Sequence, residues 1–367
     1  MQNRVPGLAA VAALTSIFAV AQTAEVKTAE QVYKNIVELK GIPAEQLQPT
    51  MQFIAASLGV QCNFCHVRDK DELDDKKPKK DARKMIAMTL AINKGHFEGN
   101  LQVTCFTCHQ GSTRVNGTPP VLETDALPPG PRGAGEAAPG GGAPGGGRGP
   151  QGPTPDQIIE KYVTALGGAD AIKKVNTRVM IGKIQTRGQE SPIELFTKAP
   201  NKRISINKTQ NGESITAFDG KIGWLGNTGR PAREMGTVES DAAGLDAEMQ
   251  LALRLKEIFR QFRPGRPEKI GDTEVVVLNA QRPNLPPVRL YFDAKTGLLV
   301  RMVRLANTAV GRNPTQIDYA DYREVDGVKM PFRWTLSRPN GRFTIQLSEV
   351  KQNVPIEDSR FTKPAGN

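Results

Sequence analysis

Two short cysteine–histidine motifs are the residues best suited to chemistry in this sequence. They read Cys62-Asn63-Phe64-Cys65-His66 and Cys105-Phe106-Thr107-Cys108-His109. The two intervening residues put both sulfurs of a motif on one side of a tight turn, where each can form a thioether to a haem vinyl group. The histidine then lies beneath the porphyrin and offers a nitrogen to the iron. This C-x-x-C-H pattern is the attachment signature of c-type haem. The sequence therefore predicts two covalently bound haem c groups, attached through Cys62, Cys65, Cys105 and Cys108, with iron ligands His66 and His109.

Two other uses of four cysteines are a disulfide framework and a structural zinc site. A zinc site needs only thiolates, and the gap between the two pairs exceeds the roughly 15–20 residues of a zinc ribbon. Neither alternative explains why two of the chain's three histidines directly follow the cysteine pairs. Haem is therefore the preferred interpretation.

Each iron needs a sixth ligand unless it is left open for catalysis. Only His96 remains after the two motifs are assigned, so at least one distal ligand must be another residue, and methionine is the common partner. Met51 is the best candidate for the first haem, because it begins a helical face that continues through Ile54, Ala55 and Leu58 before Gly59. The alternative is that Met51 fills a core.

The second motif is preceded by a similar arrangement. Residues 80–93 are expected to form a helix with Gly95 just beyond its end. Met85 and Met88 lie one turn apart on one face of it, so one could bind iron while the other packs against the ring. His96 is expected in the connecting loop. An additional helix is expected to begin at Thr28 and end near Gly41, with Gln31 completing a capping box.

These segments resemble the cytochrome c subunit of photosynthetic reaction centres, in its two-haem form. The likeness rests on ARKMIAMTLAIN from Ala82, VTCFTCHQG from Val103 and the spacing from Met51 to Cys62. It implies Met51 and Met85 as distal ligands opposite His66 and His109. The family subunit carries four haems in two pairs, whereas this chain has one pair, and His96 does not match the family's loop histidine.

The N-terminus has the features of an export signal. Arg4 gives a minimal positive region, residues 8–21 are apolar, and Ala19-Val20-Ala21 is a small-x-small cleavage site. We expect a signal peptide over 1–24 and a periplasmic protein, soluble or membrane-associated. The alternative is an uncleaved membrane anchor.

The net charge of +11 is compatible with an acidic protein partner or an anionic membrane surface. Nucleic acid is not expected, because no compact Lys/Arg run carries interleaved aromatic residues. Acidic residues are mixed into the basic stretch 69–84, which is typical of a solvated surface. The expected partners are redox proteins, including a membrane complex.

The composition divides the rest of the chain. A helical two-haem cytochrome c domain is expected over 25–117, and a Pro/Gly-rich flexible linker over 118–154. Residues 155–367 predict a separate α+β domain with an antiparallel curved sheet. Its signals are a short helix over 158–166, a helix over 245–259, strands over 275–278, 288–292 and 298–303, and turns at Asn211-Gly212, Asp219-Gly220, Asp326-Gly327 and Asn340-Gly341.

This second half resembles the lipoprotein-carrier and lipoprotein-sorting superfamily, which forms a half-barrel around an apolar groove. The likeness rests on FDGKIGW from Phe218, DYREVDGVKMPF from Asp321 and the ending over 356–364. It implies binding of an apolar ligand or a protein. Trp224 and Trp334 could line such a groove or fill the core.

The predicted function is relay of single electrons, not enzymatic catalysis, because iron with two axial ligands has no open site for substrate. Two alternatives remain at this point. One is a peroxidase-type enzyme with one open iron, and the other is a ligand-binding β module with a redox-sensing haem domain.

Overall fold

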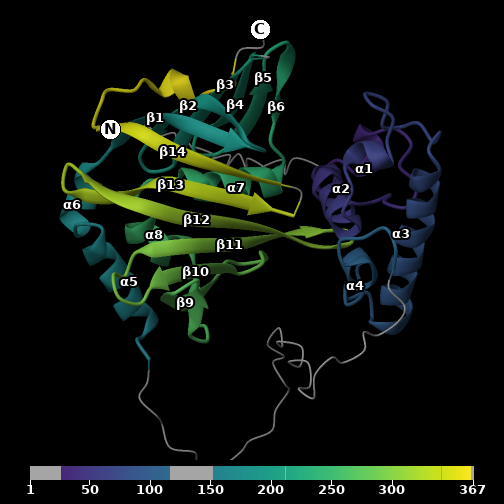
Figure 1. Ribbon diagram of the computed structural model, residues 1–367, viewed down its shortest axis with the longest axis horizontal. Helices are drawn as coiled ribbons and strands as arrows, with labels where there is room; N and C mark the ends of the chain where they lie inside the picture. The colour runs from purple at the N-terminus through teal and green to yellow at the C-terminus, as the bar shows by residue number, and fades with distance from the viewer. Residues whose placement is uncertain (1–25, 116–151, 211, 340, 365–367) are drawn as a thin grey trace, which may run out of the picture.

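The computed structural model describes residues 26–115 and 152–364, apart from Asn211 and Asn340. The described residues form a helical part, 26–115, and a β-rich part that begins with the helix after Thr154 (Figure 1). The expected signal peptide and nearly all of the expected linker lie outside the described residues. No helix within the two described ranges is both long and apolar enough to cross a membrane.

The helical part contains four helices and one 3-10 turn. They are α1 (Ala29–Val32), α2 (Ala44–Leu58), η1 (Cys62–Phe64), α3 (Lys77–His96) and α4 (Cys105–His109). The long helices α2 and α3 each precede one of the cysteine motifs, as expected. Helix α2 ends where predicted, at Gly59, whose φ of 67° is the left-handed conformation that glycine adopts without strain.

Two expected helices have different boundaries. The predicted capping box at Thr28 is present, but α1 ends at Val32 because the backbone becomes extended at Tyr33. Beyond it, Asn35 takes a left-handed φ of 58°, and the Glu30 carboxylate accepts the amide of Gly41 at 2.9 Å. Helix α3 is longer than expected and includes Gly95. The left-handed residues beyond its end are Glu98 (φ 55°) and Gly99 (φ 80°), and the amide of Gly99 donates to the Asn93 carbonyl at 3.0 Å.

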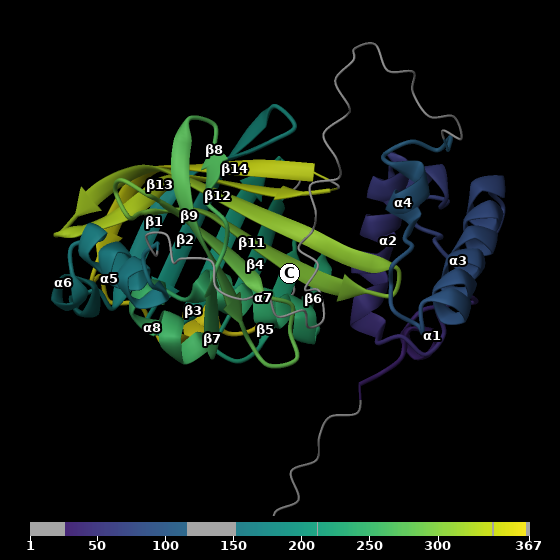
Figure 2. The ribbon, with the colours of Figure 1, turned by 90° about the horizontal axis from the view of Figure 1, so that it is seen from below.

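The β-rich part is one antiparallel sheet of fourteen strands, which confirms the predicted fold class. The strands follow the order β6-β5-β4-β3-β2-β1-β14-β13-β12-β11-β10-β9-β7, with β8 paired to β9. Their bounds are β1 (Thr177–Thr186), β2 (Gln189–Lys198), β3 (Lys202–Thr209), β4 (Gly212–Phe218), β5 (Gly223–Asn227), β6 (Arg230–Glu234), β7 (Gln261–Pro264), β8 (Glu268–Ile270), β9 (Thr273–Gln281), β10 (Val288–Asp293), β11 (Leu299–Thr308), β12 (Gly311–Val325), β13 (Val328–Arg338) and β14 (Gly341–Gln352). The sheet is strongly curved (Figure 2).

The predicted turns fall between paired strands. Asp219-Gly220 joins β4 to β5, and Asp326-Gly327 joins β12 to β13. Asn211 and Asn340 lie outside the described residues, and the strands on either side of each are paired. Left-handed backbone at Asp326 (φ 48°) and Gly327 (φ 80°) is what a tight hairpin requires.

Four helices accompany the sheet: α5 (Pro155–Ala165), α6 (Ala169–Lys174), α7 (Thr237–Ala247) and α8 (Leu251–Ile258), followed later by η2 (Asp358–Phe361). Helix α5 confirms the helix expected over 158–166. The single helix expected over 245–259 is wrong. The backbone is extended at Glu248, and the amide of Met249 donates to the carbonyl of Pro200 at 3.1 Å, so the chain breaks into α7 and α8.

The largest apolar core lies between the sheet and helices α5, α6 and α8. A smaller core belongs to the helical part and includes a residue from far along the chain. Val310, in the turn between β11 and β12, is fully buried against Leu47 and Ile54 of α2. The two parts therefore meet where this hairpin reaches α2 (Figure 1).

Candidate functional site

The first cysteine motif forms a tight turn directly after α2. Gly59 ends the helix, and η1 then carries Cys62. The amides of Cys65 and His66 both donate to the Cys62 carbonyl, at 3.2 and 2.9 Å. This turn holds the backbone of the two cysteines and the histidine in one compact loop.

The second motif forms the short helix α4, which the sequence reasoning did not include. Thr104 caps it, and its backbone amide donates to the Thr107 hydroxyl at 3.0 Å. The helix ends at Gln110, which has a left-handed φ of 49°. Both motifs are therefore single turns closed by local hydrogen bonds.

The two histidines are held in the same way. His66 Nδ1 lies 3.0 Å from the backbone oxygen of Asp71, and His109 Nδ1 lies 2.9 Å from the backbone oxygen of Ser112. A carbonyl oxygen can only accept, so each Nδ1 donates a hydrogen, and Nε2 is the ring nitrogen left to bind a metal. Metal-binding histidines characteristically have such a partner, because it fixes the tautomer and the ring orientation.

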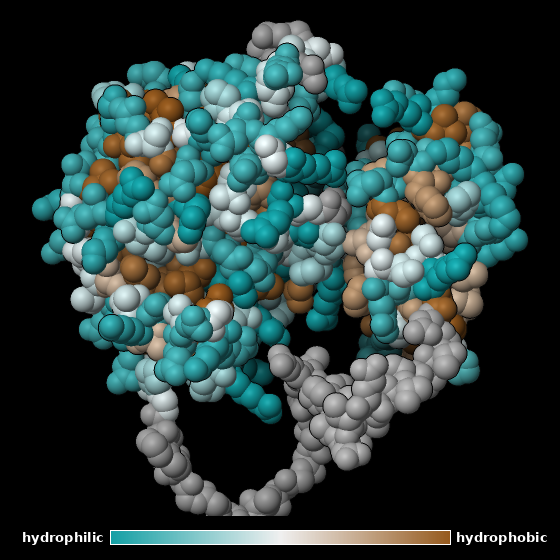
Figure 3. All heavy atoms as spheres, in the orientation of Figure 1, coloured by the Kyte–Doolittle hydropathy of each residue, from teal (hydrophilic) through white to brown (hydrophobic). Residues whose placement is uncertain are grey.

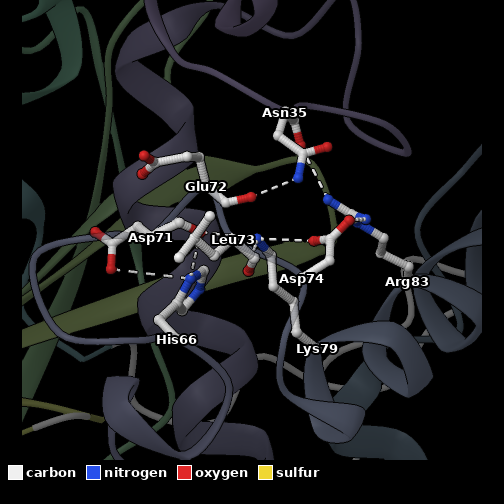
Figure 4. Close-up of polar contacts among 8 residues, drawn as sticks. All are labelled: Asn35, His66, Asp71, Glu72, Leu73, Asp74, Lys79 and Arg83. Atoms are coloured by element: carbon white, nitrogen blue, oxygen red, sulfur yellow. Dashed lines mark hydrogen bonds and ion pairs between the residues drawn. The ribbon is translucent and has the colours of Figure 1, made fainter.

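The loop that orients His66 is anchored to the first turns of α3 (Figure 4). Lys79 donates to the backbone oxygens of Asp71 and Leu73 at 2.7 and 2.8 Å. Arg83 binds the Asp74 carboxylate at 2.6 Å and the Asn35 carbonyl at 3.0 Å. Hydrogen bonds from Arg83 first, and from Asn35 and Lys79, hold the pKa of Asp74 well below its usual range.

A buried asparagine on the same helix positions the second motif. The Asn93 side-chain oxygen accepts the amides of Gln102 and Val103, both at 2.9 Å, and its nitrogen donates to the Val103 carbonyl at 2.6 Å. Asn93 is almost fully buried. This side chain fixes the segment that enters α4, and nothing in the sequence pattern distinguished it from other polar helix residues.

The methionines occupy the helices that precede the motifs. Met51 is half-buried and contacts the small core of the helical part. Met85 and Met88 are 46% and 47% exposed, one turn apart on α3. His96 is the last residue of α3, not a loop residue, and it is exposed. The assignment of Met51 and Met85 as iron ligands stays a prediction.

The surface around the motifs fits a large apolar ring. Phe64 and Phe106, inside the two motifs, are 42% and 53% exposed, alongside the two exposed methionines of α3. Hydrophobic residues are visible on this part of the surface in Figure 3. The exposed apolar side chains at the two C-x-x-C-H motifs form a surface that two porphyrin rings would cover.

All four cysteines are free in the structure. Burial raises the pKa of the Cys65 and Cys105 thiols. Four free thiols in two C-x-x-C-H turns are compatible with thioether attachment of haem, and the roles of Cys62, Cys65, Cys105 and Cys108 stay a prediction.

The sheet encloses a second site, a cavity of about 810 Å³. Its walls come from the sheet, from α7 and from Gln48, Pro49 and Gln52 of α2. Trp334 lines it, as one expectation allowed, whereas Trp224 packs in a separate small core. Several arginines also line the cavity, and sequence reasoning did not identify them, because their strands are brought together only by the fold.

Comparison with known proteins found relatives of the N-terminal part. The family model of the photosynthetic reaction centre cytochrome C subunit matches residues 8–118. The photosynthetic reaction center cytochrome c subunit of Thermochromatium tepidum is 33% identical over 89 residues, which are 23% of this chain and 22% of that protein. The match thus spans less than a quarter of the relative's length.

Solved structures resemble the β-rich part at low sequence identity. A lipoprotein-sorting protein domain from Vibrio parahaemolyticus has a TM-score of 0.42 at 9% identity, covering 56% of this chain and 94% of that one. A LolA superfamily protein from Nitrosomonas europaea also has a TM-score of 0.42, at 12% identity, covering 58% and 99%.

In its N-terminal part the chain is thus similar to the photosynthetic reaction centre cytochrome C subunit family, and the family match is confined to residues 8–118.

Proposed function

We propose that the protein is an exported dihaem c-type cytochrome that relays single electrons between redox partners in the periplasm. The observation that carries this proposal is the shared geometry of His66 and His109. Each directs Nδ1 to a backbone carbonyl and leaves Nε2 for a metal, directly after a pair of free cysteines. Haem bound there would supply reversible one-electron chemistry at iron.

The chain's own residues determine how the haems would be held. Cys62, Cys65, Cys105 and Cys108 would attach the two haems, and His66, His109, Met51 and Met85 would bind the irons. Such methionine–histidine ligation would raise the reduction potential and leave no open position on the iron. These residues would therefore bind and orient the cofactor without binding substrate.

Exposed lysines on α3 support a redox partner with an acidic surface. Lys80 and Lys84 are exposed on the face of the helix that continues to the exposed Met88. Lys77 is also exposed, and it pairs with Asp81 at 2.6 Å. Positive charge beside the expected second haem would steer a negatively charged redox protein, or a membrane complex with an acidic surface, toward it.

Redox titration of the matured protein tests the relay. We expect two electrons per chain, each with a reversible one-electron midpoint, and no binding of carbon monoxide to the reduced protein. Carbon monoxide binding at one site would instead support the peroxidase-type alternative with an open iron. If protein matured in the bacterial envelope takes up no electrons in the titration, the proposal is contradicted.

A further inference from the structure

The backbone oxygen of Asp71 is shared by two side chains. His66 Nδ1 lies 3.0 Å from it, and Lys79 Nζ donates to it at 2.7 Å (Figure 4). The ammonium group draws electron density from the oxygen, so this carbonyl is a weaker acceptor for the imidazole N–H than a carbonyl without a cation. A weaker hydrogen bond at Nδ1 makes the imidazole a less basic ligand at Nε2.

The charge of Lys79 is held inside the protein. Only 10% of its side chain is exposed, and its ammonium group also binds the Leu73 carbonyl at 2.8 Å and the Asp74 carboxylate at 3.1 Å. Arg83 binds the other oxygen of the same carboxylate at 2.6 Å. Two cations therefore share one anion, and the net positive charge that remains is only weakly screened by water.

A second lysine reaches the backbone of the first motif itself. Lys76 is half-buried, and its ammonium group donates to the carbonyl of Asn63, between the two cysteines of the motif. Burial raises the pKa of the Cys65 thiol, and the charges of Lys76 and Lys79 act in the opposite direction. Both ammonium groups are therefore close enough to act on a sulfur that would hold the first haem.

The second motif has the same histidine hydrogen bond without such a cation. His109 Nδ1 lies 2.9 Å from the backbone oxygen of Ser112. No lysine or arginine side chain donates to that oxygen in the part of the chain that the structure describes. Burial raises the pKa of the Cys105 thiol, and no described cation counteracts it. The two motifs thus share their geometry and differ in their charges.

Water screens the other charges near the two motifs. At the first motif, the Asp71 carboxylate lies 3.9 Å from the imidazole Nδ1, but 82% of this side chain is exposed. At the second, Lys80, Lys84 and Arg114 are all exposed. Exposed charges act much more weakly than buried ones. The buried ammonium group of Lys79 therefore makes the main electrostatic difference between the motifs.

We propose that Lys79, assisted by Lys76, raises the reduction potential of the haem on the first motif above that of the haem on the second. A positive charge favours the oxidation state of iron with the lower charge, and a less basic imidazole acts in the same direction. Lys79 is a positioning residue, because it acts through the Asp71 carbonyl and His66. An electron held by the chain is then found mainly at the first motif. This inference rests on the proposed electron relay.

Potentiometric titration of the matured two-haem protein tests the inference. Lys79→Met should lower only the higher of two midpoints. We expect about a tenfold loss in the equilibrium constant for reduction, which is about 59 mV for one electron. Lys76→Met should lower the same midpoint by less. Lys77→Met is the matched control, because Lys77 is 85% exposed and pairs with Asp81, so it should leave both midpoints unchanged.

Two further variants separate the effect of charge from a loss of structure. Lys79→Arg keeps the charge, so its higher midpoint should stay closer to the wild-type value than that of Lys79→Met. Replacing Cys105 and Cys108 by alanine removes the second attachment site, and the remaining haem should have the higher midpoint. If Lys79→Met does not fold, Lys76→Met and this double variant decide.

Three results would overturn the inference: a shift of the lower midpoint, equal shifts of both midpoints, or no shift in the folded lysine-to-methionine variants at positions 76 and 79. The masses of the denatured samples count the attached haems. A chain without haem would contradict the proposed function and this inference with it. A two-haem chain with one of the three results would contradict this inference alone.

Discussion

Gly59 lies so close to the backbone of Gly111 that no side chain fits on Gly59. A Cβ atom on Gly59 would lie 2.1 Å from the backbone oxygen of Gly111. The amide of Gly111 donates to the Ser57 carbonyl at 2.9 Å. Gly59 ends the helix that carries Met51, and Gly111 follows His109 by two residues. This contact therefore joins the two C-x-x-C-H motifs through their backbones.

Replacing Gly59 tests the importance of this contact. Gly59→Ala places a methyl group against the Gly111 carbonyl and forces alanine into a left-handed backbone, which together should cost about 2–5 kcal/mol of unfolding free energy. Gly41→Ala is the control, because Gly41 has a φ of 82° and nothing within 4 Å of its expected Cβ. It should cost only about 1–2 kcal/mol. Denaturant unfolding followed by haem absorbance measures both, and equal losses would count against the contact.

The distal ligands are tested one at a time by spectroscopy. Iron bound by methionine sulfur gives a weak absorption band near the red edge, and we expect two such contributions. Met51→Ala and Met85→Ala should each remove one of them, because alanine has no sulfur, and each reduced variant should bind carbon monoxide at one iron. Met88→Ala should retain both contributions. Loss of the band in Met88→Ala but not in Met85→Ala would reverse the assignment on α3.

The contact between the two parts depends on the β11–β12 hairpin. Val310 is fully buried, and the neighbouring Ala309 amide donates to the Thr50 hydroxyl at 3.4 Å. Val310→Asp buries a charge in this apolar contact, so we expect the hairpin to detach from α2. Small-angle X-ray scattering should then report a larger radius of gyration. Lys295→Asp, at the exposed β10–β11 turn, should not change it, and an unchanged radius for Val310→Asp would exclude this role.

The Asp74 ion pairs predict how acid affects the loop of His66. In the unfolded chain the Asp74 carboxylate has the ordinary aspartate pKa of about 3.9. In the folded protein the pKa of Asp74 is lower. The Asp74 ion pairs therefore stabilise the folded protein fully at pH values above the ordinary pKa. This stabilisation is lost as the pH falls through the lowered pKa of Asp74 in the folded protein.

Urea unfolding of wild type and Asp74→Asn at several pH values measures this contribution. The variant should be less stable at pH 7, and the two curves should converge in acid below pH 4. Asp75→Asn serves as the control, since Asp75 is the exposed neighbour and makes no ion pair among the described residues. A difference between wild type and Asp74→Asn that stays constant down to acid pH would contradict the assignment.

Much of the site could be predicted because its determinants are local. The spacing from Cys62 to His66, the helix over Met51 to Leu58 and the Asp326-Gly327 turn all depend on neighbouring residues. The features that were missed depend on contacts between distant segments. The break between α7 and α8 arises at Met249, whose amide reaches Pro200.

The pairing of Arg178 with Gln352 could not be predicted for the same reason. Arg178 and Gln352 are adjacent only because the first strand of the sheet pairs with the last. Val310 belongs to the core of the helical part for a similar reason, since a hairpin far along the chain reaches α2. No periodicity in the sequence records such pairings.

The mass of the denatured protein, after maturation in the bacterial envelope, tests the central claim most directly. Thioether bonds survive denaturation, so we expect a mass equal to the polypeptide plus two haems, falling to one haem when Cys62 and Cys65 are both replaced by alanine. A polypeptide mass with no porphyrin attached would contradict it.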